Sequence, residues 1–290
     1  MAKDKYTAIW ISHTSISDYL KCPRAYFLKN VYKDSSTGHK IQIMTPALAL
    51  GQAVHEVIES LSSIPTSSRM EESLVLKFDK VWENFTSEKG GFRDSEEEHK
   101  FKERGKAMLR RVMDNPGPIA RLAVKIQQDL PHYWISEDEN IVLCGKVDWL
   151  EYDQDLDSVH IIDFKTGKKR EDEDSLQLPI YHLLVHHCQK RPVVKASYWY
   201  LEENDNLTEK ILPDLKEAHT RVIEIGRRIK LARKLEKMEC PEGRDGCIHC
   251  QSMEKILKGE GKLVSANSQR DVYILPFEEA ETEEIDSIIL

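Results

Sequence analysis

The sequence lacks any apolar run long enough to span a bilayer, and no apolar segment follows its first residues. We therefore expect a cytoplasmic protein with no membrane association. The sequence also lacks a surplus of positive charge, because 42 Lys and Arg residues stand against 50 Asp and Glu residues and give a net charge of −8. This balance argues against a protein that binds nucleic acid over its whole surface, although net charge says little about one groove.

Two further absences narrow the function. Residues 166–169 come nearest to a G-x-x-x-x-G-K-[ST] phosphate loop, but they lack the first glycine spacing and the final hydroxyl. We therefore predict no nucleotide-driven motor of this kind. Cysteine is scarce, with 6 residues in 290. Because the cytosol keeps thiols reduced, their spacing is better examined for metal ligation than for disulfides.

A chain of 290 residues can bury a sizeable core, and we predict a single domain over residues 1–275. Its charge is distributed unevenly. Residues 216–237 carry eight positive side chains against three negative ones, whereas acidic residues cluster from Glu278 to Asp286. We predict a long basic helix over 213–237 and a disordered acidic tail over 276–290, with docking of a partner by the tail as the alternative.

The most informative stretch is 159–167, a β-branched apolar run that ends in an acid, an aromatic residue, a base and a turn. Its pattern predicts a strand. Because side chains alternate along a strand, Asp163 and Lys165 project to one side and Phe164 to the other. Taken alone, such a pair is a weak ion pair at an exposed strand end. Its meaning therefore depends on what the rest of the chain brings beside it.

Two strands are predicted before this one, at 133–135 and 141–150, and short polar turns join all three into a meander. This arrangement would place Asp148 and Asp163 on adjacent strands. Two carboxylates about 4 Å apart repel by roughly 1 kcal/mol in water and by about 4 kcal/mol at an effective dielectric constant near 20. A divalent cation would remove this repulsion.

Helical periodicity precedes the strands. We predict a helix start with Ser15 and Asp18 at capping-box spacing and a break at Pro23. A second helix, over 46–59, would place His55 on one stripe with Leu48, Gly51 and Ile58. An isolated histidine at such a position is usually a core residue. Amphipathic helices at 70–88 and 95–113 form a predicted helical insert over about 64–129.

After the central stretch, residues 175–185 predict a helix that places Gln177 and Tyr181, four residues apart, on one face. A strand at 195–201 follows. The strand-helix-strand order from 159 to 201 predicts a crossover connection and a parallel strand pair.

Four signals thus occur in a fixed order: Gly51-x-x-x-His55, Gly145-x-x-Asp148, Asp163-Phe164-Lys165 and Gln177-x-x-x-Tyr181. Together they resemble the PD-(D/E)XK nuclease superfamily, in particular the RecB and AddB nuclease domains and the CRISPR-associated RecB-type exonucleases. The resemblance covers residues 12 to about 251, with the helical insert outside the motifs. It implies an α/β, restriction-endonuclease-like fold with an αβββαβ core, a mixed central sheet and a C-terminal cysteine-rich segment.

The resemblance also implies a Mg²⁺- or Mn²⁺-dependent phosphodiesterase. Its metal ligands would be His55, Asp148, Asp163 and the backbone carbonyl of Phe164. Lys165 would orient or activate the attacking water, and Gln177 and Tyr181 would steady Lys165 and the nucleic-acid backbone. The residue types fit this chemistry independently, because carboxylate oxygens suit Mg²⁺ and a histidine ligand is equally acceptable to Mn²⁺.

The cysteine spacing points to a second metal centre. Cys240-x6-Cys247-x2-Cys250 follows the basic helix, and Cys22 matches the upstream cysteine of iron–sulfur members of the family. The resemblance implies a [4Fe–4S] cluster on these four residues. The order departs from the family's usual C-x-x-C followed by one more cysteine, so a structural Zn²⁺ site is the alternative, in which His249 could substitute. The other two cysteines, Cys144 and Cys188, are predicted to be packing residues.

The resulting hypothesis is a DNA exonuclease that acts on single-stranded ends in DNA repair, recombination or CRISPR-type processing. Its partners would be single-stranded DNA or duplex ends and a helicase or recombination protein, with phosphate contacts from the basic helix. The rival hypothesis is a nucleic-acid-binding or scaffolding module of a helicase-nuclease complex, with a vestigial site. The intact set His55, Asp148, Asp163 and Lys165 argues against this rival.

Overall fold

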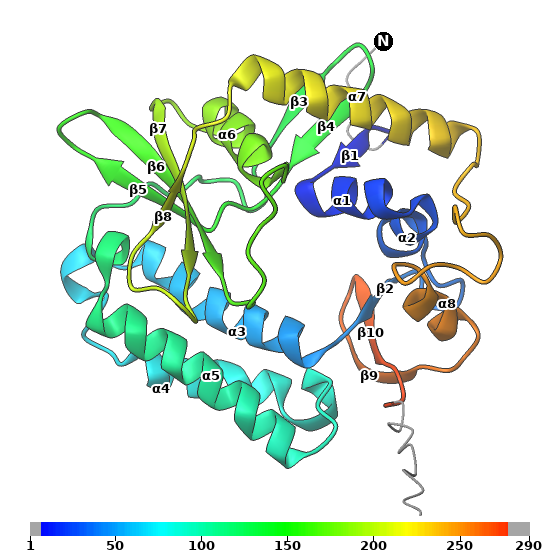
Figure 1. Ribbon diagram of the computed structural model, residues 1–290, viewed down its shortest axis with the longest axis horizontal. Coiled ribbons are helices and arrows are strands. Elements are labelled where there is room, and N and C mark those ends of the chain that lie inside the picture. Colours follow the sequence, from blue (N-terminus) through cyan, green and yellow to red (C-terminus); the bar gives the residue numbers. More distant parts are fainter. Residues whose placement is uncertain (1–6, 278–290) are drawn as a thin grey trace, which may run out of the picture.

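The structure is a computed structural model that describes residues 7–277 (Figure 1). Its helices are α1 (His13–Lys21), α2 (Pro23–Tyr26), α3 (Pro46–Ser60), α4 (Leu74–Trp82), α5 (Ser95–Asp114), α6 (Gln177–Cys188), α7 (Leu215–Lys234) and α8 (Gln251–Leu257). Its strands are β1 (Ile9–Ile11), β2 (Lys40–Ile43), β3 (His132–Ser136), β4 (Ile141–Cys144), β5 (Trp149–Asp153), β6 (Ser158–Lys165), β7 (Val193–Tyr200), β8 (Thr208–Lys210), β9 (Lys262–Ala266) and β10 (Arg270–Ile274).

Two expectations concern the ends and the membrane. The predicted acidic tail comprises residues 276–290, and residues 278–290, which hold its acidic cluster, lie outside the described residues. Within residues 7–277, no helix combines the length and the apolar character that crossing a membrane requires.

The sheet that carries the central stretch has the strand order β5-β6-β7-β8. It is mixed, as predicted, because β6 pairs antiparallel with β5 and parallel with β7. Strand β6 is buried on both faces. Val159 and Ile161 pack in one apolar cluster with residues of α6, whereas Ile162 and Phe164 pack in another with residues of α3. Helices α6 and α3 therefore lie on opposite sides of this sheet (Figure 1).

The prediction of one three-stranded meander is wrong. Residues 141–150 form two strands, β4 and β5, separated by residues 145–148. Strand β4 pairs with β1 and β3 in a separate sheet, and β2, β10 and β9 form a third. The apolar run continues through both strands, so its pattern could not reveal a change of sheet, and Gly145 weakens the strand interior at that point. Asp148 consequently lies in the break, immediately before β5.

The first helix begins slightly earlier than predicted, and its cap differs from the predicted one. Helix α1 begins one residue after Ser12, whose side chain forms the capping box with Ser15. Asp18, predicted as part of the box, instead binds Lys29 and Asn30. The break at Pro23 is confirmed, because α2 starts there.

Helix α3 has the predicted bounds within one residue, but its buried face is not the predicted stripe. Its buried residues are Ala49, Leu50, Ala53, Val54, Val57 and Ile58. Leu48 is exposed, and Gly51 and His55 are half-buried. The helix is apolar on most of its circumference, so periodicity alone did not distinguish the core face from the face that carries His55.

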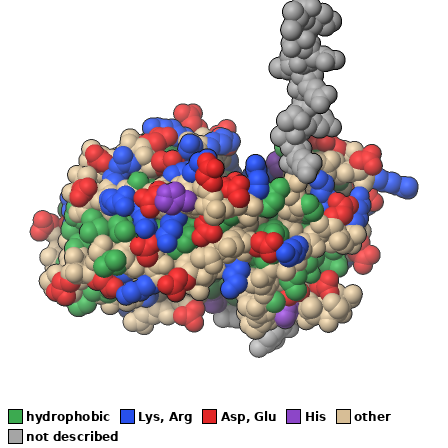
Figure 2. Space-filling view, turned by 90° about the horizontal axis from the view of Figure 1, so that it is seen from below, with side chains coloured by type: hydrophobic (Ala, Val, Ile, Leu, Met, Phe, Trp, Pro, Cys, Tyr) green, Lys and Arg blue, Asp and Glu red, His purple; other side chains and the backbone are tan. Residues whose placement is uncertain are grey.

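The helical insert packs as the hairpin α4–α5 against α3. Gly105 allows this close packing, since a Cβ there would lie 2.3 Å from the Phe78 ring. Arg104 pairs with Glu202, and Arg111 donates to the Leu201 carbonyl, so the insert is also fastened to the end of β7. Seen from below, the face over the insert carries cations and anions interspersed (Figure 2). The described side chains visible on this face therefore form no basic patch for a polyanion.

A buried polar network crosses the same sheet. His160 Nδ1 lies 2.9 Å from Glu151 Oε2, and His160 Nε2 lies 2.8 Å from Ser197 Oγ. The acid-histidine-serine order is that of a hydrolase triad. However, Ser197 is only 1 % exposed, so no substrate reaches its hydroxyl. The network therefore serves to satisfy polar groups across strands β5, β6 and β7, and the pKa of Glu151 is lowered by His160 and Arg121 against the effect of burial.

This network generates a stability prediction. Replacing His160→Ala should lower the free energy of unfolding by about 1–3 kcal/mol, because Glu151 and Ser197 would lose a buried partner. Denaturant unfolding followed by circular dichroism measures the change. The control is Lys195→Ala, an exposed residue that pairs with His160 in the strand register and should change stability by less than about 0.5 kcal/mol. Equal effects of the two substitutions would contradict the assignment.

Candidate active site

The site lies where β6 ends and α6 begins. Asp163 is 2 % exposed, and its Oδ1 accepts a hydrogen bond of 2.8 Å from Gln177 Nε2 at the start of α6. The same amide nitrogen lies 3.2 Å from the Tyr181 hydroxyl. The four-residue spacing of Gln177 and Tyr181 thus places both side chains against the acid.

Lys165 lies beside Asp163, on the same side of β6. Its Nζ is 3.0 Å from Asp163 Oδ2 and 3.0 Å from Glu171 Oε2, and it donates to Gln177 Oε1. It also lies 5.0 Å from the centre of the Tyr198 ring. Burial alone would lower the pKa of Lys165, but Asp163 and Glu171 raise it above the ordinary value. The side chain is therefore held as an ammonium ion.

Asp148 approaches from the break before β5. In the antiparallel pair, Trp149 lies opposite Ile162, so Asp148 comes level with the end of β6 that carries Asp163. Its Oδ2 accepts a hydrogen bond of 2.9 Å from the Phe164 backbone N–H and lies 3.4 Å from His55 Nδ1. The two acids and the histidine, predicted from separate motifs, are thus brought together.

Burial and the neighbouring charges shift the pKa values of Asp163 and His55. Burial, and then Asp148, raise the pKa of Asp163 to about 7, although Lys165 and His55 oppose the shift. Burial would lower the pKa of His55, but Asp148 and Glu59 raise it to about 10. The histidine is therefore a cation in the metal-free protein. Carboxylate and imidazole donors with this demand for positive charge fit Mg²⁺ or Mn²⁺.

Helix α3 can approach the end of β6 because residue 51 has no side chain. A Cβ at Gly51 would lie 3.3 Å from Thr166 Oγ1. This contact is tighter than ordinary van der Waals packing. The glycine of the Gly51-x-x-x-His55 motif therefore leaves room for α3 beside Thr166 at the strand end.

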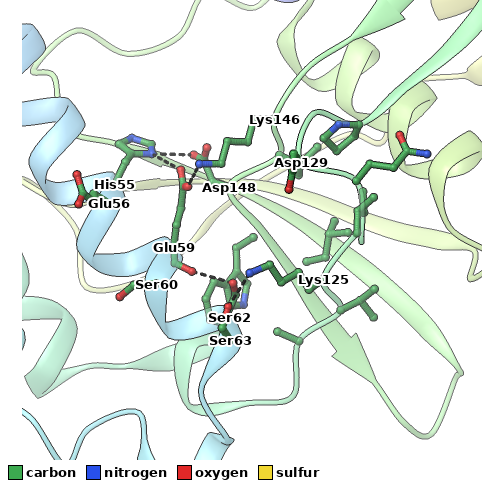
Figure 3. Close-up of a pocket in the computed structure, with 18 of the residues that line it drawn as sticks. His55, Glu56, Glu59, Ser60, Ser62, Ser63, Lys125, Asp129, Lys146 and Asp148 are labelled. Carbon is green, nitrogen blue, oxygen red and sulfur yellow. Dashed lines mark hydrogen bonds and ion pairs between the residues drawn. The ribbon is translucent and has the colours of Figure 1, made fainter. Parts of the chain in front are cut away.

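Several residues of the site were missed by sequence reasoning. Glu59 Oε1 lies 3.7 Å from His55 Nδ1, and its other oxygen pairs with Lys146 (Figure 3). The spacing of Glu59 four residues after His55 on a helix was a usable signal. Glu171 and Lys146 gave no signal, because they lie in irregular segments and only the folded chain brings them to the site.

A cavity of about 770 Å³ opens beside His55 and Asp148. Helix α3 forms one wall, and residues 123–131, which follow the insert, form another (Figure 3). Lys146 and Lys125 both line it, and Lys125 Nζ donates to Ser63 Oγ over 2.6 Å. No residue of the predicted basic segment 216–237 is among those that line it. The lysines that line the cavity thus come from irregular segments and not from α7.

A comparison of the sequence with protein-family models now bears on this geometry. The model of the PD-(D/E)XK nuclease superfamily matches residues 10–254. The chain belongs to this superfamily. Among proteins with curated functions, none matches the chain. Membership of the PD-(D/E)XK superfamily implies a metal-dependent nuclease, which is a hydrolase of phosphodiester bonds, and suggests DNA as the substrate.

This PD-(D/E)XK chain carries a second donor group, distant from the acids in the sequence. The sulfur atoms of Cys22, Cys240, Cys247 and Cys250 all lie within 4.8 Å of one another. They are embedded among apolar residues of α2, α8 and β2, and burial raises the pKa of Cys250 to about 12. Four clustered thiols of this kind are compatible with metal ligation. Cys144 and Cys188 lie outside this group.

The contacts of the Gln177 amide predict a loss of stability when it is replaced. Gln177→Leu should lower the free energy of unfolding by about 1–3 kcal/mol, because buried Asp163 would lose its donor and Lys165 its acceptor. Gln52→Leu, on the exposed face of α3, is the matched control. Thermal and denaturant unfolding of both variants measure the difference. If Gln177→Leu is as stable as Gln52→Leu, the amide does not hold the acid and the base together.

Proposed function

We propose that the chain is a Mg²⁺- or Mn²⁺-dependent deoxyribonuclease that acts as an exonuclease on single-stranded ends, in DNA repair, recombination or CRISPR-type processing. The observation that carries this proposal is the convergence of Asp148, Asp163 and Lys165 at one end of β6. Of these three, Asp148 lines the cavity, whose charged side chains are Lys125 and Lys146 together with four carboxylates and His55. His55, Asp148, Asp163 and the Phe164 carbonyl are the proposed ligands. A bound divalent ion would supply Lewis acidity and a water of lowered pKa.

Lys165 is proposed as the cation that orients the attacking water and stabilises the phosphate as negative charge develops. Its raised pKa supports this role over that of a general base, since a base must first lose its proton. Gln177 holds the ammonium and the Asp163 carboxylate in a fixed relation through its two amide atoms. Tyr181 supports the amide from the next turn of α6.

The cavity supports a nucleic-acid backbone as the occupant. Lys125 and Lys146, with the hydroxyls of Ser60, Ser62 and Ser63, offer contacts to phosphates without reading bases. Helix α7 lies elsewhere, and its Arg227 and Lys230 are engaged by Glu139. We therefore assign the phosphate contacts nearest to the scissile bond to Lys125 and Lys146. A helicase or recombination partner would then have to deliver the strand to this cavity.

The nuclease assay uses a labelled single-stranded oligonucleotide with Mg²⁺ or Mn²⁺. The wild type should shorten it progressively, and Asp163→Asn or Lys165→Met should reduce the rate by at least about a hundredfold. Lys168→Met, in the exposed loop after β6, is the control and should retain activity. Equal rates for the wild type and both site variants would refute the nuclease. Cleavage of circular single strands at the same rate would refute the exonuclease mode.

The dependence of DNA binding and cleavage on the divalent ion distinguishes the nuclease from the rival scaffold function. A nuclease needs the divalent ion to turn over, whereas a vestigial scaffold would bind DNA equally well with and without it and would cut nothing. Binding measured by fluorescence anisotropy in EDTA and in Ca²⁺, beside the cleavage assay, therefore decides between the two.

For the cysteine group we propose a structural metal, and the sulfur spacing supports Zn²⁺ over a [4Fe–4S] cluster. Four thiolates at about 2.3 Å from one tetrahedral ion stand about 3.8 Å apart. The Cys247 and Cys250 sulfurs lie 3.9 Å apart, and the four sulfurs all lie within 4.8 Å. A four-iron cluster binds each thiolate on a different iron, so its ligands stand farther apart. The site would tie the start of α2 to the segment before α8.

Metal analysis tests this choice. Protein purified anaerobically should be colourless and contain about one zinc per chain, and Cys250→Ser should reduce the zinc content. Cys188→Ser, outside the group, is the control and should leave it unchanged. Brown protein with about four irons and matching sulfide per chain would contradict the zinc assignment and restore the cluster.

A further inference from the structure

Glu59 stands out among the residues that the motifs did not include. His55, Glu59 and Asp148 are one of the two groups of metal-ligating side chains that the described residues bring together, and their donor atoms all lie within 4.8 Å of one another. Glu59 follows His55 by one turn of α3, so both side chains leave the helix on the face toward the break before β5. Asp163 is not a member of this group.

We propose that Glu59 is a further ligand of the divalent cation, with His55 and Asp148, and that Lys146 occupies the place of the cation until it binds. This proposal rests on the nuclease function proposed above and names a residue and a competitor at the same site.

The distances fit a hard divalent ion. With metal–oxygen bonds of about 2.1 Å, neighbouring donors of an octahedron stand about 3.0 Å apart and opposite donors about 4.2 Å. His55 Nδ1 lies 3.4 Å from Asp148 Oδ2 and 3.7 Å from Glu59 Oε1. The three donors therefore need only small side-chain movements to close on one ion. One histidine and two carboxylates suit Mn²⁺.

The contacts of Glu59 show the same demand for a cation. Its second oxygen pairs with the Lys146 ammonium, which reaches across the break from the residue two before Asp148 (Figure 3). Lys146 is 64 % exposed in its side chain, whereas Glu59 is 17 % exposed. An exposed lysine gains little from such a pair and leaves it at low cost. Nearby, Asp163 Oδ2 is buried and accepts no hydrogen bond, with Lys165 as its ion-pair partner.

The alternative is that Glu59 only anchors Lys146 as a structural ion pair. The two accounts predict different effects of removing Lys146. If the ammonium holds Glu59 until the cation binds, its loss should tighten metal binding in the wild type but not in Glu59→Gln. If Glu59 has no contact with the cation, the loss of the Lys146 charge should change metal binding equally in both backgrounds.

The experiment is a calorimetric titration of the full chain with Mn²⁺ alone, without DNA. Glu59→Gln should raise the dissociation constant by about tenfold or more. Glu56→Gln, exposed on the same helix and lining the same cavity, is the matched control and should stay within about twofold. Lys146→Met, a surface substitution that should not disturb folding, should lower the dissociation constant severalfold in the wild-type background and not in the Glu59→Gln background. All samples are purified in the same way, and the metal content of the cysteine group is measured in each.

The possible outcomes distinguish a failure of the Glu59 proposal from a failure of the proposed nuclease function. If the wild type binds Mn²⁺ and cleaves DNA but Glu59→Gln binds Mn²⁺ as well as Glu56→Gln does, Glu59 is no ligand and the nuclease proposal stands. If Lys146→Met binds Mn²⁺ no more tightly than the wild type, Lys146 does not occupy the place of the cation, and that part of the proposal is wrong. If the wild type neither binds Mn²⁺ nor cleaves DNA, both proposals fall.

Discussion

The structure of the site depends on one electrostatic constraint: a carboxylate, Asp163, is buried next to a second carboxylate, Asp148. Burial and the charge of Asp148 both oppose the ionisation of Asp163, and a positive partner offsets them. The chain supplies Lys165 to the first and His55 to the second. These partners come from the chain itself, and they are arranged so that a divalent ion could replace or join them. The same constraint explains the position of the Gln177 amide. Its nitrogen donates to Asp163 Oδ1, whereas Lys165 pairs with Asp163 Oδ2.

The fold meets this constraint by bringing four segments to one end of one strand. Strand β6 carries Asp163 and Lys165, the break between β4 and β5 carries Asp148, and helices α3 and α6 approach from opposite sides of the sheet. Gly51 permits the close approach of α3, and the insert α4–α5 supports that helix from behind. The cavity then opens on the α3 side, where Lys125 and Lys146 are the proposed phosphate contacts. The second donor group, formed by the four cysteines, would hold together segments that are more than two hundred residues apart.

Much of this was predictable, and the failures have physical reasons. Strand β6, helix α6 and the parallel partner β7 followed from periodicity, because each is a long, regular element buried by its neighbours. The separation of β4 from β5 did not, because an apolar run has the same pattern whether it continues in one sheet or changes to another. The core face of α3 was misassigned because the helix is apolar around most of its circumference, so periodicity did not single out one face. Glu171 and Lys146 lie in irregular segments, whose positions depend on long-range packing, and no local pattern encodes that. The position of Glu59 beside His55 was predictable from its spacing. It was not predicted, because a glutamate on a helix is usually an exposed surface residue.

The central claim is that the acids at the end of β6 bind the divalent ion that a nuclease requires. The most direct measurement is a crystal structure of the full chain grown with Mn²⁺, with anomalous scattering used to locate the metal. The account predicts an anomalous peak in contact with the carboxylates of Asp148 and Asp163 and beside His55. It would be contradicted by Mn²⁺ peaks that lie only elsewhere on the protein while Lys165 and protonated His55 still neutralise the two acids.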